Sequence, residues 1–279
     1  MPESRQPVSR AGVAPAVSGT AASSGAAGAA AAEIVVSVRE LAKTFGRTKA
    51  LDGLSLDVRR GEKYGLVGPN GSGKTTLLRA IVGLVEPEAG EVRVLGEEVP
   101  SPRIAARIGY MTQSAALYED LTVRENLRFF ARLFGADART AERVEEVLAL
   151  VDLKPRGDSP VRTLSGGMKQ RASLAAALVH YPEIMILDEP TVGVDPELRL
   201  GLWEHFNRLN REGRTFIIST HVMDEAERCG RVGLLRLGRL LAEGTPEELK
   251  REAKASSLEE AYLWFARRAS GEPATGKGR

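Results

Sequence analysis

The stretch Gly68-Pro69-Asn70-Gly71-Ser72-Gly73-Lys74-Thr75 matches the phosphate-loop pattern G-x-x-x-x-G-K-[ST] at every specified position. The apolar run before it, residues 64–67, predicts a buried strand, and residues 76–82 predict a helix. Glycines lack a Cβ and let the backbone approach a phosphate closely, while the N–H groups at a helix start favour negative charge. The pattern places Lys74 to reach the outer phosphates of a nucleotide and the Thr75 hydroxyl to bind Mg²⁺. The alternative is a glycine-rich turn that binds nothing, and the flanking strand and helix favour the phosphate loop.

The composition is that of an ordinary globular protein. The chain has 279 residues, of which 43% are hydrophobic and 27% charged, and its net charge of +2 predicts no strong attraction to nucleic acid or acidic lipid. Its single cysteine, Cys229, excludes an intramolecular disulfide, fits a reducing cytoplasm and is expected to be structural. Residues 1–32 are rich in alanine, glycine and serine, too weakly apolar to span a membrane, and are expected to be a disordered extension. We expect a flexible tail over 270–279 and membrane association only through a partner.

Strand and helix patterns alternate after residue 33 and predict an α/β fold. No strand pattern interrupts residues 114–164, so we expect a helical lobe inserted in the α/β core. One helix there has an apolar face formed by Val123, Leu127, Phe130 and Phe134. A basic row, Arg124, Arg128 and Arg132, lies beside it as either a solvated face or a docking surface.

Acidic residues end the apolar run 184–187. Because parallel strands deliver their carboxyl ends to the ligand-binding edge of a sheet, Asp188 is expected to hold Mg²⁺ through water and Glu189 to act as general base on an attacking water. A charged strand end that only meets solvent is the alternative. His221 follows the apolar strand 215–220 and reaches the same edge if the strands are parallel, although a lone histidine is more often structural.

Weaker signals lie elsewhere in the chain. Gln113 ends a short strand, where an amide can orient water and complete a Mg²⁺ shell. Ser165 is placed to cap a helix whose first N–H groups, at Gly166 and Gly167, form either an anion site or an ordinary helix start. Phe45 is either an aromatic that stacks on a base or a core or loop residue.

In this order, the motifs resemble the ATP-binding subunit of an ABC transporter over residues 34–265. The resemblance identifies Gly68 to Thr75, followed by Thr76, as the Walker A loop, and Leu164 to Met168 as the family signature, with methionine where glutamine is commonest. It matches the run from Ile184 to Asp188 with the Walker B motif and Glu189 with the catalytic glutamate of the family. The other matches are Phe45 as the adenine-stacking aromatic, Gln113 of the Q-loop, Asp195 of the D-loop and His221 as the switch histidine.

The resemblance implies a P-loop NTPase core, with a mixed or parallel sheet flanked by helices, an antiparallel β subdomain and an inserted helical subdomain. The ABC domain is expected over 33–269, with the insert at about 114–164. ATP and Mg²⁺ are the implied cofactors, and hydrolysis is expected from Glu189, His221 and Gln113. Phe45, the Walker A residues, Ser165, Gly166, Gly167 and Asp195 are expected to bind nucleotide, and Thr75, Gln113 and Asp188 the metal.

In this family two ATP-binding subunits meet head to tail, and each ATP lies between Walker A of one and the signature of the other. The implied partners are a second such subunit and separate membrane-spanning permease subunits. The chain is therefore expected in the cytoplasm, peripheral on the inner face of the membrane. Residues 109–113, 121–127 and 257–261 resemble exporters of drugs, polysaccharides or lipids, and nothing here names the cargo.

Other function classes are a soluble ABC-type ATPase acting on DNA or ribosomes and a non-catalytic ATP-sensing regulator. Chromosome-maintenance relatives separate Walker A from the signature by long coiled coils, and translation-factor relatives carry two ATPase domains. Here Gly73 and Ser165 lie too close for a coiled coil, and the chain has one phosphate loop. Measured ATP turnover distinguishes the regulator from an ATPase.

Overall fold

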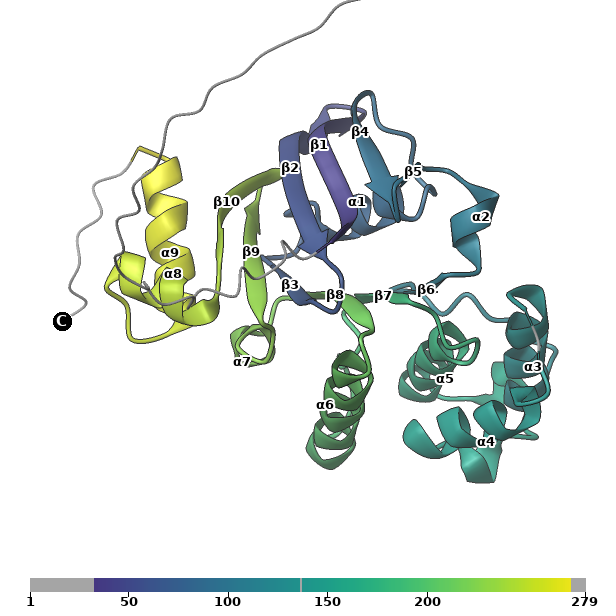
Figure 1. Ribbon diagram of the computed structural model, residues 1–279. Helices are drawn as coiled ribbons and strands as arrows, with labels where there is room; N and C mark the ends of the chain where they lie inside the picture. Colours follow the sequence, from purple (N-terminus) through teal and green to yellow (C-terminus); the bar gives the residue numbers. More distant parts are fainter. Residues whose placement is uncertain (1–32, 136, 272–279) are drawn as a thin grey trace, which may run out of the picture. The chain divides into compact units, whose positions relative to one another are not determined.

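The protein is described by a computed structural model that covers residues 33–135 and 137–271, and it contains two β-sheets (Figure 1). The antiparallel sheet has the order β2-β1-β4-β5. The larger sheet has the order β10-β9-β3-β8-β7-β6, in which β10 is antiparallel to β9 and the other neighbours are parallel. This arrangement confirms the predicted combination of a mixed sheet with an antiparallel β unit.

The strands of the antiparallel sheet are β1 (Ile34–Phe45), β2 (Thr48–Arg59), β4 (Ala89–Val94) and β5 (Glu97–Glu98). Those of the larger sheet are β3 (Lys63–Val67), β6 (Ile108–Met111), β7 (Ile184–Asp188), β8 (Thr215–Thr220), β9 (Arg231–Arg236) and β10 (Arg239–Gly244). β3, β7 and β8 are almost entirely buried, which explains why their sequences read as continuous apolar runs.

The segment between the first two predicted strands differs from expectation. Phe45 is not in a loop but is the last residue of β1, paired with Thr48 across a tight turn at Gly46. The pairing extends both strands through polar residues whose local sequence is a weak strand signal, because cross-strand contacts decide strand formation more than propensity does. Register shifts within the pair let β1 and β2 bend along their length.

Helix α1 (Lys74–Ile81) follows the phosphate loop and packs its apolar residues in one hydrophobic cluster with both sheets. A second cluster covers the opposite face of the larger sheet, and it contains residues of α5 (Gly166–Leu178) and α6 (Pro196–Arg211). Within it Phe206 lies 5.8 Å from Trp203 and 5.4 Å from Phe216 of β8, measured between ring centroids. The sheet that carries the strand ends is therefore packed on both faces.

The segment 114–164 contains α3 (Val123–Leu133), α4 (Thr140–Leu150) and two 3-10 turns, Lys154–Arg156 and Val161–Thr163. Its described residues contain no strand, only an isolated bridge between Thr122 and Pro160. Val123 and Leu127 are buried as predicted, whereas Phe130 is only half-buried and Asn126 is fully buried. The predicted helical character is observed; the boundaries of a separate subdomain stay a prediction.

The arginine row on α3 is not uniform. Arg124 pairs with Glu145 and Asp158, and its side chain is only 18% exposed. Arg128 and Arg132 are exposed and form no ion pair with any residue that the structure describes. A solvated basic face of three arginines is therefore wrong for Arg124, whose guanidinium ties α3 to α4 and to the loop beyond it.

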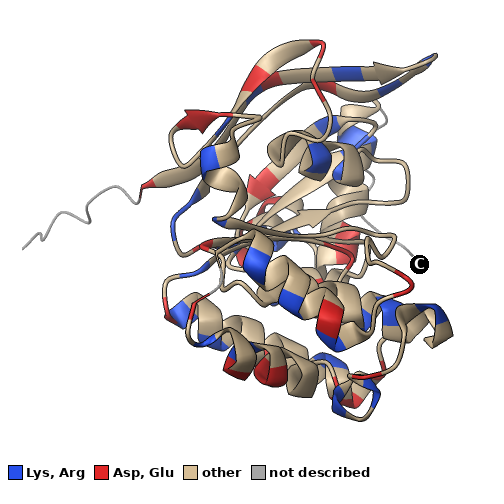
Figure 2. Ribbon diagram, turned by 90° about the vertical axis from the view of Figure 1, so that its right-hand side faces the viewer, with Lys and Arg blue, Asp and Glu red and all other residues tan. Residues whose placement is uncertain are grey.

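The shorter helices are α2 (Pro102–Ala105) and α7 (Met223–Ala226), and the chain closes with α8 (Pro246–Ala253) and α9 (Leu258–Ala269). In Figure 2 basic and acidic residues are interspersed along the helices seen from that side, as the small net charge leads one to expect. The extension predicted for 1–32 lies outside the described residues, as does the predicted tail beyond Gly271.

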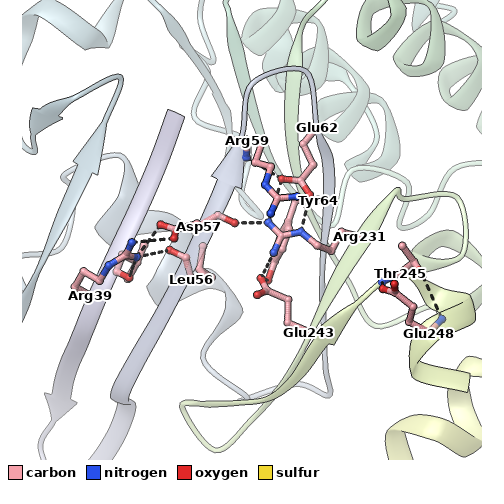
Figure 3. Close-up of polar contacts among 11 residues, drawn as sticks. Arg39, Leu56, Asp57, Arg59, Glu62, Tyr64, Arg231, Glu243, Thr245 and Glu248 are labelled. Atoms are coloured by element: carbon pink, nitrogen blue, oxygen red, sulfur yellow. Dashed lines mark hydrogen bonds and ion pairs between the residues drawn. The ribbon is translucent and has the colours of Figure 1, made fainter. Parts of the chain in front are cut away.

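A polar cluster joins the two sheets (Figure 3). Arg231 of β9 pairs with Glu62 at 2.6 Å and with Glu243 of β10 at 2.9 Å, and it donates to the backbone carbonyl of Asp57 on β2. The fully buried Tyr64 donates its hydroxyl to Glu243 at 2.7 Å, and burial is the main cause that raises the pKa of Tyr64. Charge in this partly shielded position is tolerated because each charged group has a partner.

Cys229 gives a direct test of the packing behind β3. It is 5% exposed, and burial raises the pKa of its thiol to about 12. Because the thiolate is the reactive form, the folded protein is expected not to react with a disulfide reagent at mildly alkaline pH, and to react stoichiometrically once denaturant is added. As this is the single cysteine, the absorbance of the released thiol reports one site. Rapid reaction of the folded protein would contradict the packing described.

Candidate nucleotide site

The parallel register of β3, β8 and β7 assembles the site. Val67 at the end of β3 pairs with Thr220 of β8, and Asp188 at the end of β7 pairs with Ser219. The phosphate loop, the acid pair and His221 leave the sheet directly after these strands. The expectation that His221 reaches the edge that carries Asp188 is therefore confirmed by the strand pairing.

The phosphate loop is held in a form that its glycines alone permit. A Cβ on Gly68 would lie 2.3 Å from the backbone oxygen of Leu235, and Gly73 precedes α1 with φ of 107°. Lys74 is 5% exposed and donates from Nζ to the backbone oxygens of Gly68 at 2.7 Å and Pro69 at 3.1 Å. Burial is the main cause lowering the pKa of Lys74, and the nearby carboxylate of Glu189 opposes it.

The turn between β9 and β10 supports the loop from behind. The backbone N–H of Gly238 donates to the backbone oxygen of Ser72 at 2.9 Å, and the backbone oxygen of Gly238 accepts from the Asp52 N–H at 3.0 Å. A Cβ on Gly73 would lie 2.4 Å from the oxygen of Ala50, so β2 also approaches closely. The loop is thus fixed by contacts that are distant in the sequence.

Asp188 is fully buried beside the loop. Its Oδ1 accepts from the Ser219 hydroxyl at 2.5 Å, whereas its Oδ2 and the buried hydroxyl of Ser72 have no hydrogen-bond partner in the described part of the chain. An orphaned carboxylate oxygen is costly unless something else satisfies it. A carboxylate and hydroxyls at this edge are the oxygen donors that Mg²⁺ prefers, so the residues fit that ion.

Glu189 brings three predicted residues together. Its Oε1 lies 3.7 Å from Lys74 Nζ and 3.2 Å from His221 Nδ1, and its backbone N–H donates to the Ser219 hydroxyl at 3.0 Å. The residue has a positive φ of 52°, a conformation that non-glycine residues rarely adopt and that functional sites often retain. Its side chain is 10% exposed, whereas that of His221 is 43% exposed toward solvent.

The other predicted residues lie apart from this cluster. Gln113 is exposed just after β6, beside β7, and Phe45 is 51% exposed at the tip of the β1–β2 turn. Ser165 and Asp195 cap α5 and α6, where their side chains accept from the N–H groups of Met168 and Leu198. No described contact joins Ser165, Gly166 or Gly167 to the phosphate loop of the same chain.

Comparison with known proteins decides the family. The model of the ABC transporter family matches residues 51–192. The Nod factor export ATP-binding protein I of Ralstonia nicotianae is 42% identical over 219 residues, 77% of this chain and 68% of that protein. The chain belongs to the ABC transporter family.

Other relatives and solved structures of ABC proteins agree. The probable multidrug ABC transporter ATP-binding protein YbhF of Escherichia coli is 42% identical over 224 residues, which is 79% of this chain but 39% of that protein. The structure of an ATP-binding subunit of an ABC transporter matches with a TM-score of 0.78 and 31% identity over 83% of this chain and 99% of that one. A dimeric ATP-binding cassette in a post-hydrolysis state, bound to ADP and Pi, matches with a TM-score of 0.71 and 28% identity. The match covers 75% of this chain and 98% of that one.

Several residues of this ABC protein's site give little sequence signal. Ser219 holds Asp188 and Glu189, yet it reads only as a polar residue near the end of an apolar strand. The position of Ser219 near the end of β8, which runs parallel to β7, is the one signal that could have placed it beside Asp188. Gly238 and Leu235 could not be found, because their contact with the phosphate loop depends on where the β9–β10 turn lies in the fold.

We predict that Gly68→Ala weakens ATP binding at least about tenfold, because the new Cβ would meet the Leu235 oxygen and the loop must shift. Gly201→Ala is the matched control: Gly201 lies inside α6, and a Cβ there meets nothing within 4 Å. The control should keep ATP affinity and gain roughly 0.5–1 kcal/mol of stability. Titration with a fluorescent ATP analogue measures both variants. Equal affinities would show that the close approach of Gly68 is irrelevant to the ligand.

Proposed function

We propose that this chain is the ATP-hydrolysing subunit of an ABC exporter and that ATP closes two such subunits on each other. The observation that carries the proposal is the meeting of Lys74, Glu189 and His221 beside the buried Asp188. A non-catalytic ATP sensor does not need a general base, and all the catalytic positions of the family are occupied here by competent side chains.

Each residue of the cluster has a role that its position supports. Lys74 exchanges its loop carbonyls for the outer phosphates of ATP. Glu189 takes the proton from the attacking water, and His221, on the same carboxylate, orients it and contacts the γ-phosphate. Thr75, Asp188 and Gln113 are the residues that would hold Mg²⁺, whose charge offsets that of the phosphates. Phe45 is exposed, as an aromatic that stacks on adenine must be.

A second subunit completes the site. Ser165, Gly166 and Gly167 are exposed at the start of α5, and Asp195 is exposed at the start of α6. Exposed N–H groups at a helix start bind anions readily, and this chain's own phosphate loop does not reach them. The partner is a second copy or a close relative, in line with the dimeric state of a structural neighbour.

A groove supports docking of a permease. It has a volume of about 470 Å³ and a mainly apolar lining that includes Leu84, Ala105, Phe130, Phe134 and Ala176. These residues come from α2, α3, α5 and the loop after α1, so the groove lies between the sheet region and the helical segment. No helix of the described chain is both long and apolar enough to cross a bilayer. A short helix of a membrane subunit is the proposed occupant, and it would hold the chain on the cytoplasmic face.

Export is proposed from the relatives. Two groups of similar proteins are named for Nod factor export and for probable multidrug transport. The site described here binds the nucleotide and not the cargo, so the cargo class is set by the membrane subunits.

Glu189→Gln tests the catalytic assignment. The amide cannot accept the proton, so ATP turnover should fall about 100-fold or more, whereas ATP binding should persist. Glu204→Gln, an exposed residue on α6, is the control with the same charge change and should keep wild-type turnover. With Mg-ATP, the Glu189→Gln variant should scatter as a dimer. Undiminished turnover would remove Glu189 as base, and a strictly monomeric variant would contradict ATP-driven closure.

Ala105→Trp tests the groove. Ala105 is exposed on α2 and lines the groove, so the indole should occlude it. When the chain is co-expressed with its cognate membrane subunit, we expect co-purification to be lost while the ATPase rate of the isolated chain changes less than about twofold. Ala138→Trp, also exposed but outside the groove, should keep co-purification. Retained association of Ala105→Trp would place the permease elsewhere.

A further inference from the structure

A buried carboxylate with no assigned role lies behind the catalytic cluster. Glu225 belongs to the short helix α7 and is 5% exposed. Its Oε1 accepts from the Thr191 hydroxyl at 2.5 Å, and its Oε2 accepts from the Thr220 hydroxyl at 3.0 Å. Both threonines are themselves buried, at 3% and 2% exposure. Within the described part of the chain no lysine, arginine or histidine pairs with this carboxylate.

The placement of the two hydroxyl donors is informative. Thr220 immediately precedes His221, and Thr191 comes two residues after Glu189. His221 and Glu189 contact each other at 3.2 Å on the side that faces the phosphate loop. Glu225 therefore bridges the backbone segments that carry the two groups, and among the described residues it forms no hydrogen bond or ion pair with either side chain.

Further hydrogen bonds extend the bridge. The Thr220 hydroxyl accepts from the Val222 N–H at 3.0 Å, and the Thr220 backbone oxygen accepts from the Gly68 N–H at 3.4 Å. The backbone oxygen of Thr191 accepts from the Val194 N–H at 3.2 Å, within the turn that leads to Asp195. The start of the phosphate loop, the segment of His221 and the turn after Glu189 are thus linked through one carboxylate.

We propose that Glu225 is a positioning residue for ATP hydrolysis: it fixes the separation of His221 and Glu189 by holding Thr220 and Thr191 at a set distance. The inference rests on the proposed function of the same site. Burying a carboxylate among neutral donors is costly, and this cost is explained if two convergent acceptors are needed. A glutamine offers one acceptor and an NH₂ donor, so it cannot accept from both hydroxyls at its two ends in the same way.

The kinetic test uses Glu225→Gln and Glu225→Ala. Because small misplacement of catalytic groups has large effects on rate, kcat should fall roughly 10- to 100-fold while the dissociation constant for ATP changes less than about twofold. Glu227→Gln is the control: it lies two residues on, is exposed and pairs with Lys250. It should keep wild-type kcat. Unchanged kcat in the Glu225 variants, or an equal loss of kcat and of ATP affinity, overturns the proposal.

The hydroxyl partner supplies a second pair of variants with smaller changes in side-chain volume. Thr191→Ser keeps the donor and should retain kcat within about threefold, whereas Thr191→Val removes it at nearly constant volume and should match Glu225→Gln. The double variant Thr191→Val/Glu225→Gln should be no slower than either single one, because both break the same link. Additive losses, or a Thr191→Ser variant as slow as Thr191→Val, contradict the link.

Amide hydrogen exchange gives a readout that needs no turnover. In Glu225→Ala the Val222 and Val194 N–H groups should exchange about tenfold faster or more, because their acceptor residues lose the bridge, while Glu227→Gln should leave them unchanged. If the wild type does not hydrolyse ATP but the exchange result holds, the proposed function fails and the bridge stands as a structural link only. If wild type hydrolyses ATP and exchange is unaffected, the positioning role fails.

Discussion

The hydrogen-bonded register of three parallel strands, β3, β8 and β7, is the constraint on which the rest of the structure depends. It brings the phosphate loop to the same edge of the sheet as the Asp188–Glu189 pair and His221, which lie more than 100 residues further along the chain. Apolar burial of both sheet faces makes this register specific, since a slip of one residue would exchange the side chains that fill the two clusters. The chemistry of the site is therefore a consequence of core packing and not of any local segment.

The charged side chains at that edge of the sheet are stabilised by the groups that lie next to them. Lys74, Asp188 and Glu189 are buried, and burial disfavours each charge taken alone. Lys74 lies between loop carbonyls and the carboxylate of Glu189, while Ser219 satisfies one oxygen of Asp188 and leaves the other free. A triphosphate with Mg²⁺ would add an acceptor for the lysine and a cation for that oxygen. Ligand binding would therefore offset the charges that the protein without ligand leaves unbalanced.

Sequence alone predicted the parts of the fold that short-range pattern controls. The phosphate loop, the α/β order, the helices of 114–164 and the strand that ends at Asp188 follow from motif and periodicity. The expected end of the first strand was wrong, because pairing with β2 extends β1 through polar residues as far as Phe45. Ser219, Glu225 and Gly238 were beyond reach because their contacts join segments distant in sequence, and one polar residue in a strand or short helix carries no local mark. The groove was missed for the same reason.

The turn after Glu189 connects the cluster of Lys74, Glu189 and His221 to the exposed starts of α5 and α6. Asp195, the cap of α6, lies six positions after Glu189, and a Cβ on Gly167 would lie 3.6 Å from the backbone oxygen of Gly193 within this turn. Thr191 lies in the same turn and is held by Glu225. A partner that contacts the start of α5 or α6 would therefore act on a segment whose other end is Glu189, which is held at a positive φ. Under the proposed function, a change confined to this short turn would couple closure of two subunits to the position of Glu189.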